Sequence, residues 1–391
     1  MELDQGFPAP ASGSKVWSTG PTQVSVEHEL REVRSVAIPM SSGDLWEERV
    51  DAGATDLSAI FDPFAEARGL LLAVSGGPDS VALMLMAVEW ARRAAAPPPL
   101  FVATVDHGLR QESREEAETV ARWAAALALP HEILTWRGDK PRTRIQELAR
   151  EARYALLIDH AVKIGADHVV TAHHADDQAE TILFRLLRGS GIAGLTGMAH
   201  SSLRNGIVVA RPLLAYPKAR LLAYCQAKAH PFLHDPSNAN PDFARTRLRR
   251  LRGLLADAGL DRQALLRLGR RAERANAALA QASQATHAKL KIDRGPAAFS
   301  ADLTPFTHQT EEILLRILAD ELKLIRGERP VRLDRLESLV SVLIERLAKR
   351  SPFRGTLGGM IIALDSTGWL MVRQEKTRRR GQGHTSRKER R

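Results

Sequence analysis

Short apolar runs alternate with longer helical stretches between residues 70 and 228 of this 391-residue chain. The runs predict buried strands, and the stretches place apolar side chains along one helix face. The predicted strands span residues 70–74, 100–105, 132–136, 168–171 and 207–210. Helices are predicted at 79–94, 112–127, 144–164, 176–187 and 217–228. Because these helices are long enough to be crossover connections, the pattern predicts an α/β fold with a doubly wound parallel sheet.

The flanking regions differ from this alternating segment, which we assign to residues 51–235. Residues 1–50 are rich in Ser, Gly and Pro without a sustained period, which predicts a disordered extension. Residues 236–375 are predicted to be mainly helical, with one helical pattern over 243–290, another over 297–350 and a strand-turn-strand over 356–372. Residues 376–391 carry eight Lys or Arg and one Glu, which predicts a basic disordered tail.

Composition narrows the classes of function. The chain has 56 Lys and Arg against 46 Asp and Glu, an excess that favours a polyanionic partner, with a merely solvated basic face as the alternative. Its one cysteine, Cys225, excludes an internal disulfide and a cysteine cluster for zinc or iron–sulfur, so we expect it to be a packing residue. We expect no transmembrane helix, since no window holds about 18 uncharged apolar residues, and without a secretory signal pattern we expect a cytoplasmic protein.

The segment SGGPDS, residues 75–80, joins the first predicted strand to the first predicted helix. A helix N-terminus presents free N–H groups and a partial positive charge, so it suits a phosphate. Gly76 and Gly77 let the backbone approach an anion, and Pro78 fits the first helical turn. Asp79 would need a cation to face phosphate, which predicts a Mg²⁺ ligand. The alternative is an ordinary glycine-rich turn.

Hydroxyl and acidic groups complete the candidate site. Ser75 and Ser80 are potential donors to phosphate within the loop. Asp106 and His107 follow the second strand, where parallel sheets bind ligands, so we expect them to meet the base and ribose of a nucleotide. Asp177 and Glu180 are three residues apart and share a helix face, where they could hold a metal or an ammonium group. A capped amphipathic helix is the alternative for this last stretch.

A series of motifs carries a family resemblance over residues 70–250. In order they are SGGPDS, DHGLR, AREARYALL, HHADDQAET, LLRGSG, RPLL and DPSN, the last followed by Phe243 and Arg245. The series resembles the tRNA(Ile)-lysidine synthetase family of pyrophosphatase-loop enzymes, and HHADDQAET with LLRGSG is its most specific part. The resemblance implies an adenine nucleotide α-hydrolase-like sheet domain that binds ATP, a helical linker and a small C-terminal α+β domain.

The resemblance also implies a reaction and a set of substrates. Such enzymes adenylate the oxygen on carbon 2 of the wobble cytidine in an isoleucine tRNA with a CAU anticodon, and the amine of free lysine then attacks carbon 2 and releases AMP. By resemblance, Asp79 binds Mg²⁺, Arg153 stabilises the α-phosphate or adenylate, and Asp177 and Glu180 hold the lysine ammonium. Arg245 would act at the transition state or on the tRNA. The oligomeric state stays open, a homodimer included.

Ten arginines between residues 245 and 274 favour an RNA-binding helical face, against the alternative of a salt-bridged solvated face.

The rivals for the function as a whole are another enzyme of the same loop class, such as a tRNA thiolase or an ammonia-using synthetase, and a catalytically silent RNA-binding protein. Thiolases of this class use cysteine pairs, which this chain lacks. An ammonia-using synthetase would need an ammonia source, and the chain has no recognisable glutaminase segment.

Overall fold

The computed structural model describes residues 55–108, 112–138, 145–233, 244–308, 310–327 and 331–375. Within these ranges the side chains of residues 146, 244–247, 249, 250, 252 and 308 are not described. The predictions for residues 1–50, for the tail 376–391 and for the DPSN segment therefore lie outside the described residues. Arg245 lies in a described helix, but its side chain does not belong to the described set.

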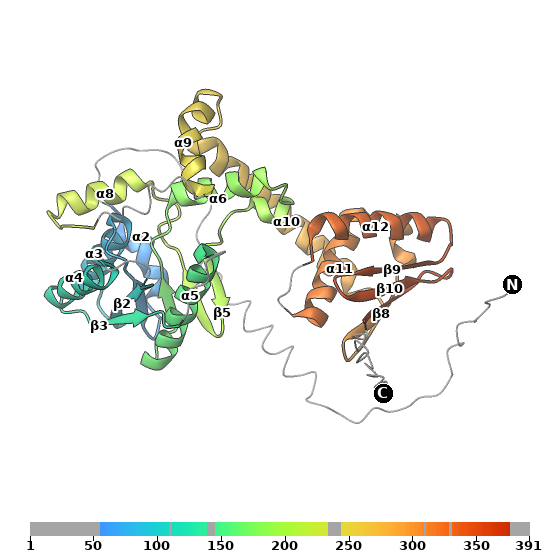
Figure 1. Ribbon diagram of the computed structural model, residues 1–391, viewed down its shortest axis with the longest axis horizontal. Helices are drawn as coiled ribbons and strands as arrows, with labels where there is room; N and C mark the ends of the chain where they lie inside the picture. The colour runs from blue at the N-terminus through green and yellow to red at the C-terminus, as the bar shows by residue number, and fades with distance from the viewer. Residues whose placement is uncertain are drawn as a thin grey trace, which may run out of the picture. The chain divides into compact units, whose positions relative to one another are not determined.

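The first sheet has six strands in the order β3-β2-β1-β4-β6-β5 (Figure 1). The strands are β1 (Leu70–Ala73), β2 (Leu100–Asp106), β3 (His131–Thr135), β4 (His168–Val170), β5 (Ser201–Arg204) and β6 (Ile207–Ala210). All neighbours pair in parallel except β5, which pairs antiparallel with β6. The predicted doubly wound parallel sheet is confirmed. From β1 the order runs outward to β2 and β3 on one side and to β4 and β6 on the other.

The five helices predicted for this part begin and end close to their predicted residues, and one short helix, of residues 192–195, was not predicted. They are α3 (Pro78–Arg93), α4 (Glu112–Ala126), α5 (Ile145–Ile164), α6 (Ala175–Leu187), α7 (Ile192–Leu195) and α8 (Lys218–Ala227). Upstream lie α2 (Leu57–Phe61) and the 3₁₀ turn η2 (Asp62–Phe64). One face of the sheet is covered by α5, whose Leu157 and Ala161 pack on Leu71 and Val169. Cys225 on α8 is fully buried, as expected of a packing residue.

The edge strand β5 is absent from the sequence prediction. Its side chains are half-buried or exposed, so it has no buried run to mark it. The signal that was available is Asn205-Gly206, whose residues both adopt positive φ, at 49° and 78°. Two consecutive positive φ values make the tight hairpin turn for which Asn-Gly is favoured.

Residues beyond 243 form two helices and then a second sheet. The helices are α9 (Ala244–Asp257) and α10 (Arg262–His287), and the sheet is antiparallel in the order β7-β8-β11-β10-β9. Its strands are β7 (Ile292–Gly295), β8 (Ala298–Asp302), β9 (Phe353–Leu357), β10 (Met360–Leu364) and β11 (Trp369–Gln374). Between β8 and β9 lie the 3₁₀ turn η4 (Thr304–His308), α11 (Glu311–Arg326) and α12 (Leu333–Ala348).

The second sheet corrects two details of the prediction while confirming a small C-terminal α+β unit. The helical pattern expected over 297–350 begins with a strand, β8, and the expected strand-turn-strand over 356–372 is three strands with two turns. One face of the sheet packs on α11 and α12 through a shared apolar core that includes Leu314, Val340 and Leu370. Across the ranges that the structure describes, none of the helices combines the length and apolarity needed to cross a membrane.

The helix α10 contributes to two cores. Near its start, Leu265 packs with Ile182 and Leu183 of α6, while Leu279 near its end packs against the C-terminal core. Its Gly269 is where α6 comes close, because a Cβ there would lie 2.6 Å from Cδ1 of Ile182. The end of α10 is fixed by Glu321 of α11, a buried carboxylate that contacts Nε2 of His287 at 2.7 Å and the Arg294 guanidinium.

Candidate active site

The loop 75–80 is folded by its own serines. The Ser80 hydroxyl donates to the Gly77 carbonyl oxygen at 2.9 Å and accepts from the Ser75 backbone N–H at 3.1 Å. The Ser75 and Ser80 hydroxyls are themselves 3.3 Å apart. Gly77 precedes the first turn of α3 without a side-chain cap, and Pro78 takes the first helical position. The N–H groups of this turn have no side-chain cap, and they lie where the sequence analysis expects a phosphate to bind.

Gly76 is required at its position for two independent reasons. Its φ is +89°, a region that costs an L-residue about 1–2 kcal/mol. A Cβ there would also lie 2.5 Å from Cδ1 of Leu233, whose backbone N–H donates to the Gly76 carbonyl oxygen at 2.9 Å. The loop is thus held against Leu233 by a backbone hydrogen bond, and the Leu233 side chain lies close to Gly76.

Asp79 lies in the first turn of α3 and meets two cationic groups. One carboxylate oxygen, Oδ2, is 3.5 Å from Nε2 of His174 and 3.5 Å from Nζ of Lys218. The other oxygen, Oδ1, is buried and has no hydrogen-bond partner among the described residues. Burial raises the pKa of Asp79, but the hydrogen bond from His174 and the charge of Lys218 outweigh it, so the pKa lies below its ordinary value.

His174 joins this loop to α6. It caps α6, because its Nδ1 accepts from the Asp177 backbone N–H at 3.4 Å while the Asp177 carboxylate accepts from the His174 backbone N–H at 3.2 Å. Burial lowers the pKa of His174, but the hydrogen bond to Asp79 and the charges of Asp177 and Asp176 raise it more, so the net shift is upward. Nε2 of His174 faces Asp79 while its Nδ1 serves the cap, so one ring joins the two helices.

The paired acids lie on α6 as their spacing predicts. Asp177 is in the first turn, 3.4 Å from Nε2 of His174, and Glu180 follows one turn later as a buried residue. Further along α6, Ile182 and Leu183 pack with Leu248 of α9 and Leu265 of α10. The contact of Asp79 with His174 joins the start of α3, which carries Ser80, to the start of α6, which carries Glu180.

A third helix begins at the same place. The Asp176 carboxylate accepts from the Lys218 backbone N–H at 2.9 Å, at the first turn of α8, and lies 3.7 Å from the Arg262 guanidinium at the first turn of α10. The N-termini of α3, α6 and α8 thus converge, and each carries a partial positive charge. Such a convergence favours a ligand with several negative charges.

Asp106 is the last residue of β2 and His107 follows it, but the Asp106 carboxylate is committed to the local turn. It accepts from the Gly108 backbone N–H at 2.8 Å and from the Ser113 hydroxyl at 2.6 Å. His107 meets the Trp136 ring edge to face, with ring centroids 6.2 Å apart. Trp136 directly follows β3, so an aromatic side chain that the sequence analysis did not single out joins this edge.

Arg153 lies apart from these contacts, among other arginines on α5 and the β5–β6 hairpin. Its guanidinium is 5.4 Å from the centroid of the buried Tyr154 ring, which also faces Arg150 and Arg204. Burial raises the pKa of Tyr154, but Arg150, Arg153 and Arg211 together lower it below its ordinary value. Among the contacts of the described residues, none joins Arg153 to the phosphate loop.

Comparison with known proteins agrees with this geometry. A family model described as the PP-loop domain matches residues 51–252. A tRNA(Ile)-lysidine synthase of a Methylobacterium species is 48% identical over 84% of this chain and 96% of its own. The tRNA(Ile)-lysidine synthase of Rhodopseudomonas palustris is 45% identical over 82% of this chain and 94% of its own. The chain belongs to the tRNA(Ile)-lysidine synthase family.

A solved structure gives a more distant match. The U34-tRNA thiolase NcsA from Methanococcus maripaludis aligns with 55% of this chain and 76% of its own, at 14% identity and a TM-score of 0.46. A similarity of that size supports no conclusion about fold or activity. The family assignment therefore rests on the sequence relatives and on the matched PP-loop domain.

The oxygen atoms at the loop 75–80 suit a Mg²⁺ ion that the protein would hold together with the substrate phosphates. No group of three or more His, Cys, Asp or Glu side chains among the described residues is arranged to hold a metal by itself. Mg²⁺ is typically held by one or two carboxylates together with substrate phosphates and water. The partner-free Oδ1 of Asp79 is a donor of the required kind.

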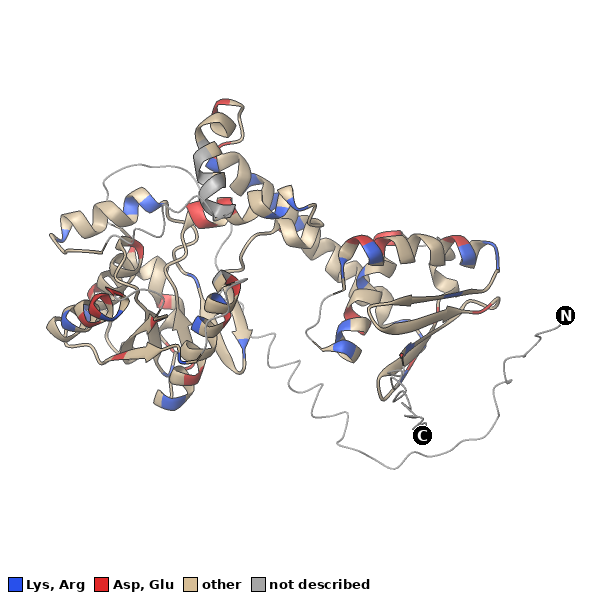
Figure 2. Cartoon of the chain, viewed as in Figure 1, with Lys and Arg blue, Asp and Glu red and all other residues tan. Residues whose placement is uncertain are grey.

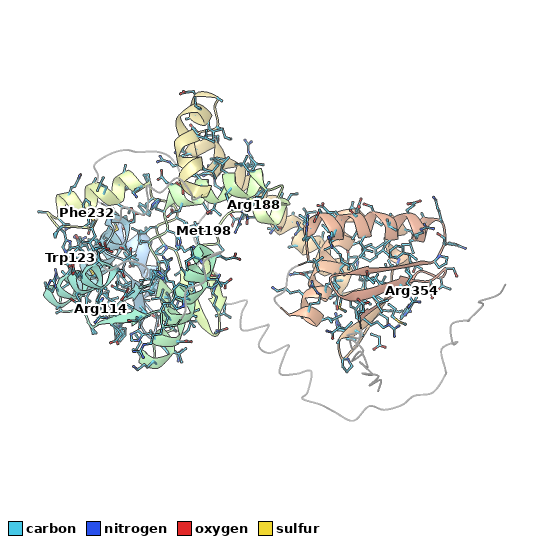
Figure 3. The ribbon with its side chains drawn as sticks, in the orientation of Figure 1. Arg114, Trp123, Arg188, Met198, Phe232 and Arg354 are labelled. Atoms are coloured by element: carbon cyan, nitrogen blue, oxygen red, sulfur yellow. The ribbon has the colours of Figure 1, made fainter. Side chains whose placement is uncertain are left out.

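Arginines follow α10 away from the site (Figure 2). Arg267, Arg271 and Arg274 are exposed and spaced for one side of that helix. In Figure 3, Arg188 and Met198 mark the neighbouring segment between α6 and β5. Gln178 fixes this segment, since its side-chain amide exchanges hydrogen bonds with the Met198 backbone at 2.9 and 2.7 Å. Gln178 belongs to the quoted motif, but its partner could not be inferred from spacing.

Proposed function

We propose that this chain ligates lysine to carbon 2 of the wobble cytidine of the CAU anticodon of tRNA-Ile, using ATP through an adenylated tRNA intermediate. The observation that carries the proposal is the contact chain from Asp79 through His174 to Asp177. It brings a phosphate loop and a pair of acids to the same edge of a parallel sheet. The products are lysidine, AMP and pyrophosphate.

In the first step, the oxygen on carbon 2 of the cytosine attacks the α-phosphorus of ATP, and pyrophosphate leaves. The N–H groups at the start of α3 bind the departing pyrophosphate, and the hydroxyls of Ser75 and Ser80 join them by exchanging their hydrogen bonds within the loop for phosphate oxygens. Asp79 is the residue that would hold Mg²⁺, which when bound offsets charge on the phosphates. Asp106 holds the turn that presents His107 to the nucleoside.

In the second step, the side-chain amine of lysine attacks carbon 2. A carbon–nitrogen bond forms, the carbon–oxygen bond to the adenylate breaks, and AMP leaves with the oxygen. Asp177 and Glu180 hold the lysine ammonium and accept the proton that it must lose before attack. The burial of Glu180 strengthens such an interaction, because charges attract more strongly away from water.

The remaining parts bind tRNA in this proposal. Residues 51–235 form the ATP-binding domain and residues 236–375 the tRNA-contacting region, with the arginines of α9 and α10, Arg245 among them, meeting phosphates. Arg153 supports the adenylate from the α5 side, and the tail 376–391 adds basic charge. The reaction takes place in the cytoplasm, where tRNA, ATP and free lysine are available.

The test supplies purified isoleucine tRNA, ATP and radiolabelled lysine, with the methionine tRNA that shares the anticodon as control. The proposal expects lysine incorporation and pyrophosphate release with the isoleucine tRNA only. Pyrophosphate release without lysine incorporation would favour another enzyme of the loop class. Binding of tRNA with neither product would favour a silent RNA-binding protein.

A further inference from the structure

The phosphate loop lacks a basic side chain of its own. Within residues 75–80 the single charged group is Asp79, which is negative. Other nucleotide loops place a lysine directly after their glycines, where its ammonium reaches the β- and γ-phosphates. ATP carries most of its charge on those phosphates, so a cation is expected from elsewhere in the fold.

Lys218 brings a cation to the loop from the first turn of α8. Its Nζ is 3.5 Å from Oδ2 of Asp79, and about half of its side chain is exposed. Among the described residues, Asp79 is the one ion-pair partner of the Lys218 ammonium. A half-exposed pair of this kind is weak, so the ammonium can change partner at little cost.

The position of Lys218 is fixed by the fold, independently of its ammonium. Its backbone N–H donates to Asp176 at 2.9 Å, and Leu221 and Cys225 of α8 are buried. The Cys225 thiol donates to the Pro78 carbonyl oxygen at 3.3 Å, which ties α8 to the start of α3. The backbone of Lys218 therefore stays beside the phosphate loop whatever its side chain does.

We infer that Lys218 is a phosphate-binding residue of the ATP site, which exchanges Asp79 for the β- or γ-phosphate of ATP when the nucleotide binds. Three helix N-termini and this ammonium then face the departing pyrophosphate together. The inference rests on the proposed function for the identity of the nucleotide, but it concerns the binding of ATP and needs neither tRNA nor lysine.

The test is the affinity of the full chain for an ATP analogue with a methylene bridge between its α- and β-phosphates, measured by calorimetry beside AMP. Lys218→Ala should lower the affinity for the analogue by about 10- to 100-fold, as expected for loss of a charge-assisted hydrogen bond. AMP lacks the β- and γ-phosphates, so its affinity should stay within about twofold. Lys218→Arg should recover most of the loss, because it restores the positive charge.

The matched control is Lys228→Ala, which removes the same charge from the other end of α8, where Lys228 pairs with Glu89 at 2.6 Å. It should leave the affinity for both nucleotides unchanged. Equal affinity of wild type and Lys218→Ala for the analogue would overturn the inference, as would an equal loss for AMP. Failure of the wild type to make lysidine while it binds the analogue through Lys218 would overturn the proposed function alone.

Discussion

The site where α3, α6 and α8 begin and the arginine side of α10 use charge in opposite ways. At the former, Asp79, His174 and Asp177 are largely buried, and His174 contacts the two carboxylates at 3.5 and 3.4 Å. Along α10, Arg267, Arg271 and Arg274 are exposed. Buried charges are screened little by salt, whereas exposed ones bind polyanions through release of counterions. The first region suits small ligands held in one geometry, and the second suits a long phosphate backbone.

The largest effect expected in the buried region is from Asp79→Asn. The amide keeps the shape but loses the charge that faces Lys218 and His174 and that would hold Mg²⁺, so pyrophosphate release should slow by about 100-fold or more. The exposed Asp159 of α5 gives the control, Asp159→Asn, which should leave the rate unchanged. A rate for Asp79→Asn within about threefold of wild type would contradict the role of this carboxylate.

A smaller effect follows from the shape of the loop, with Gly165 as a matched position. Both Gly76 and Gly165 have positive φ, but a Cβ at Gly165 meets nothing within 4 Å. Gly76→Ala and Gly165→Ala should each lower the free energy of unfolding by about 1–2 kcal/mol. Only Gly76→Ala should lower the affinity for ATP, by about tenfold. Leu233 blocks the Cβ of the new alanine, so the loop must move. Nucleotide titration beside thermal unfolding separates the two effects.

The exposed region is tested by Arg267→Gln combined with Arg271→Gln. Loss of two phosphate contacts should lower the affinity for tRNA about tenfold at low salt. It should also reduce the slope of log affinity against log salt concentration by about 2. The affinity for ATP should not change. A double variant of Arg92 and Arg122, exposed on α3 and α4, is the control of equal charge. An unchanged salt slope would mean that tRNA does not contact this side of α10.

The smallest effect is the pH dependence of the contact between Asp79 and His174. Because the pKa of His174 is raised, its contribution to stability is complete below about pH 6.5 and is lost as the pH rises through the raised value. Because the pKa of Asp79 is lowered, its contribution is complete above about pH 3.8 and is lost as the pH falls further. His174→Gln should flatten the fall of stability above pH 6.5, measured by urea unfolding. If the stability of His174→Gln falls above pH 6.5 as steeply as that of wild type, groups other than His174 cause the fall.

The buried region was largely predictable because its signals are local. The starts of α3 and α6 follow from SGGPDS and HHADDQAET, and the spacing of Asp177 and Glu180 predicted their shared face. Contacts between distant segments were not predictable. Lys218 and Asp79 lie 139 residues apart in sequence, and only the packing of α8 on α3 brings them together. The approach of Arg204 to the Tyr154 ring is likewise a tertiary contact.

The second part of the chain was predicted less well for a different reason. The strand β8 has only five residues, between two long helical patterns, so its alternation was read as part of a helix. Its partner is β11, some seventy residues later, and this pairing places Phe299 and Ala301 in the core. Apolar periodicity therefore identified the core residues of α11 and α12 but not the sheet beneath them.

The central claim is that the phosphate loop and the acids of α6 serve one substrate in two successive steps. A single-turnover reaction of Asp177→Asn tests it directly, since the amide oxygen can keep the cap on the His174 N–H while the charge is lost. With labelled ATP, lysine and isoleucine tRNA, we expect pyrophosphate release near the wild-type rate, AMP retained on the tRNA and no lysine incorporated. Normal lysine incorporation by this variant would contradict the account.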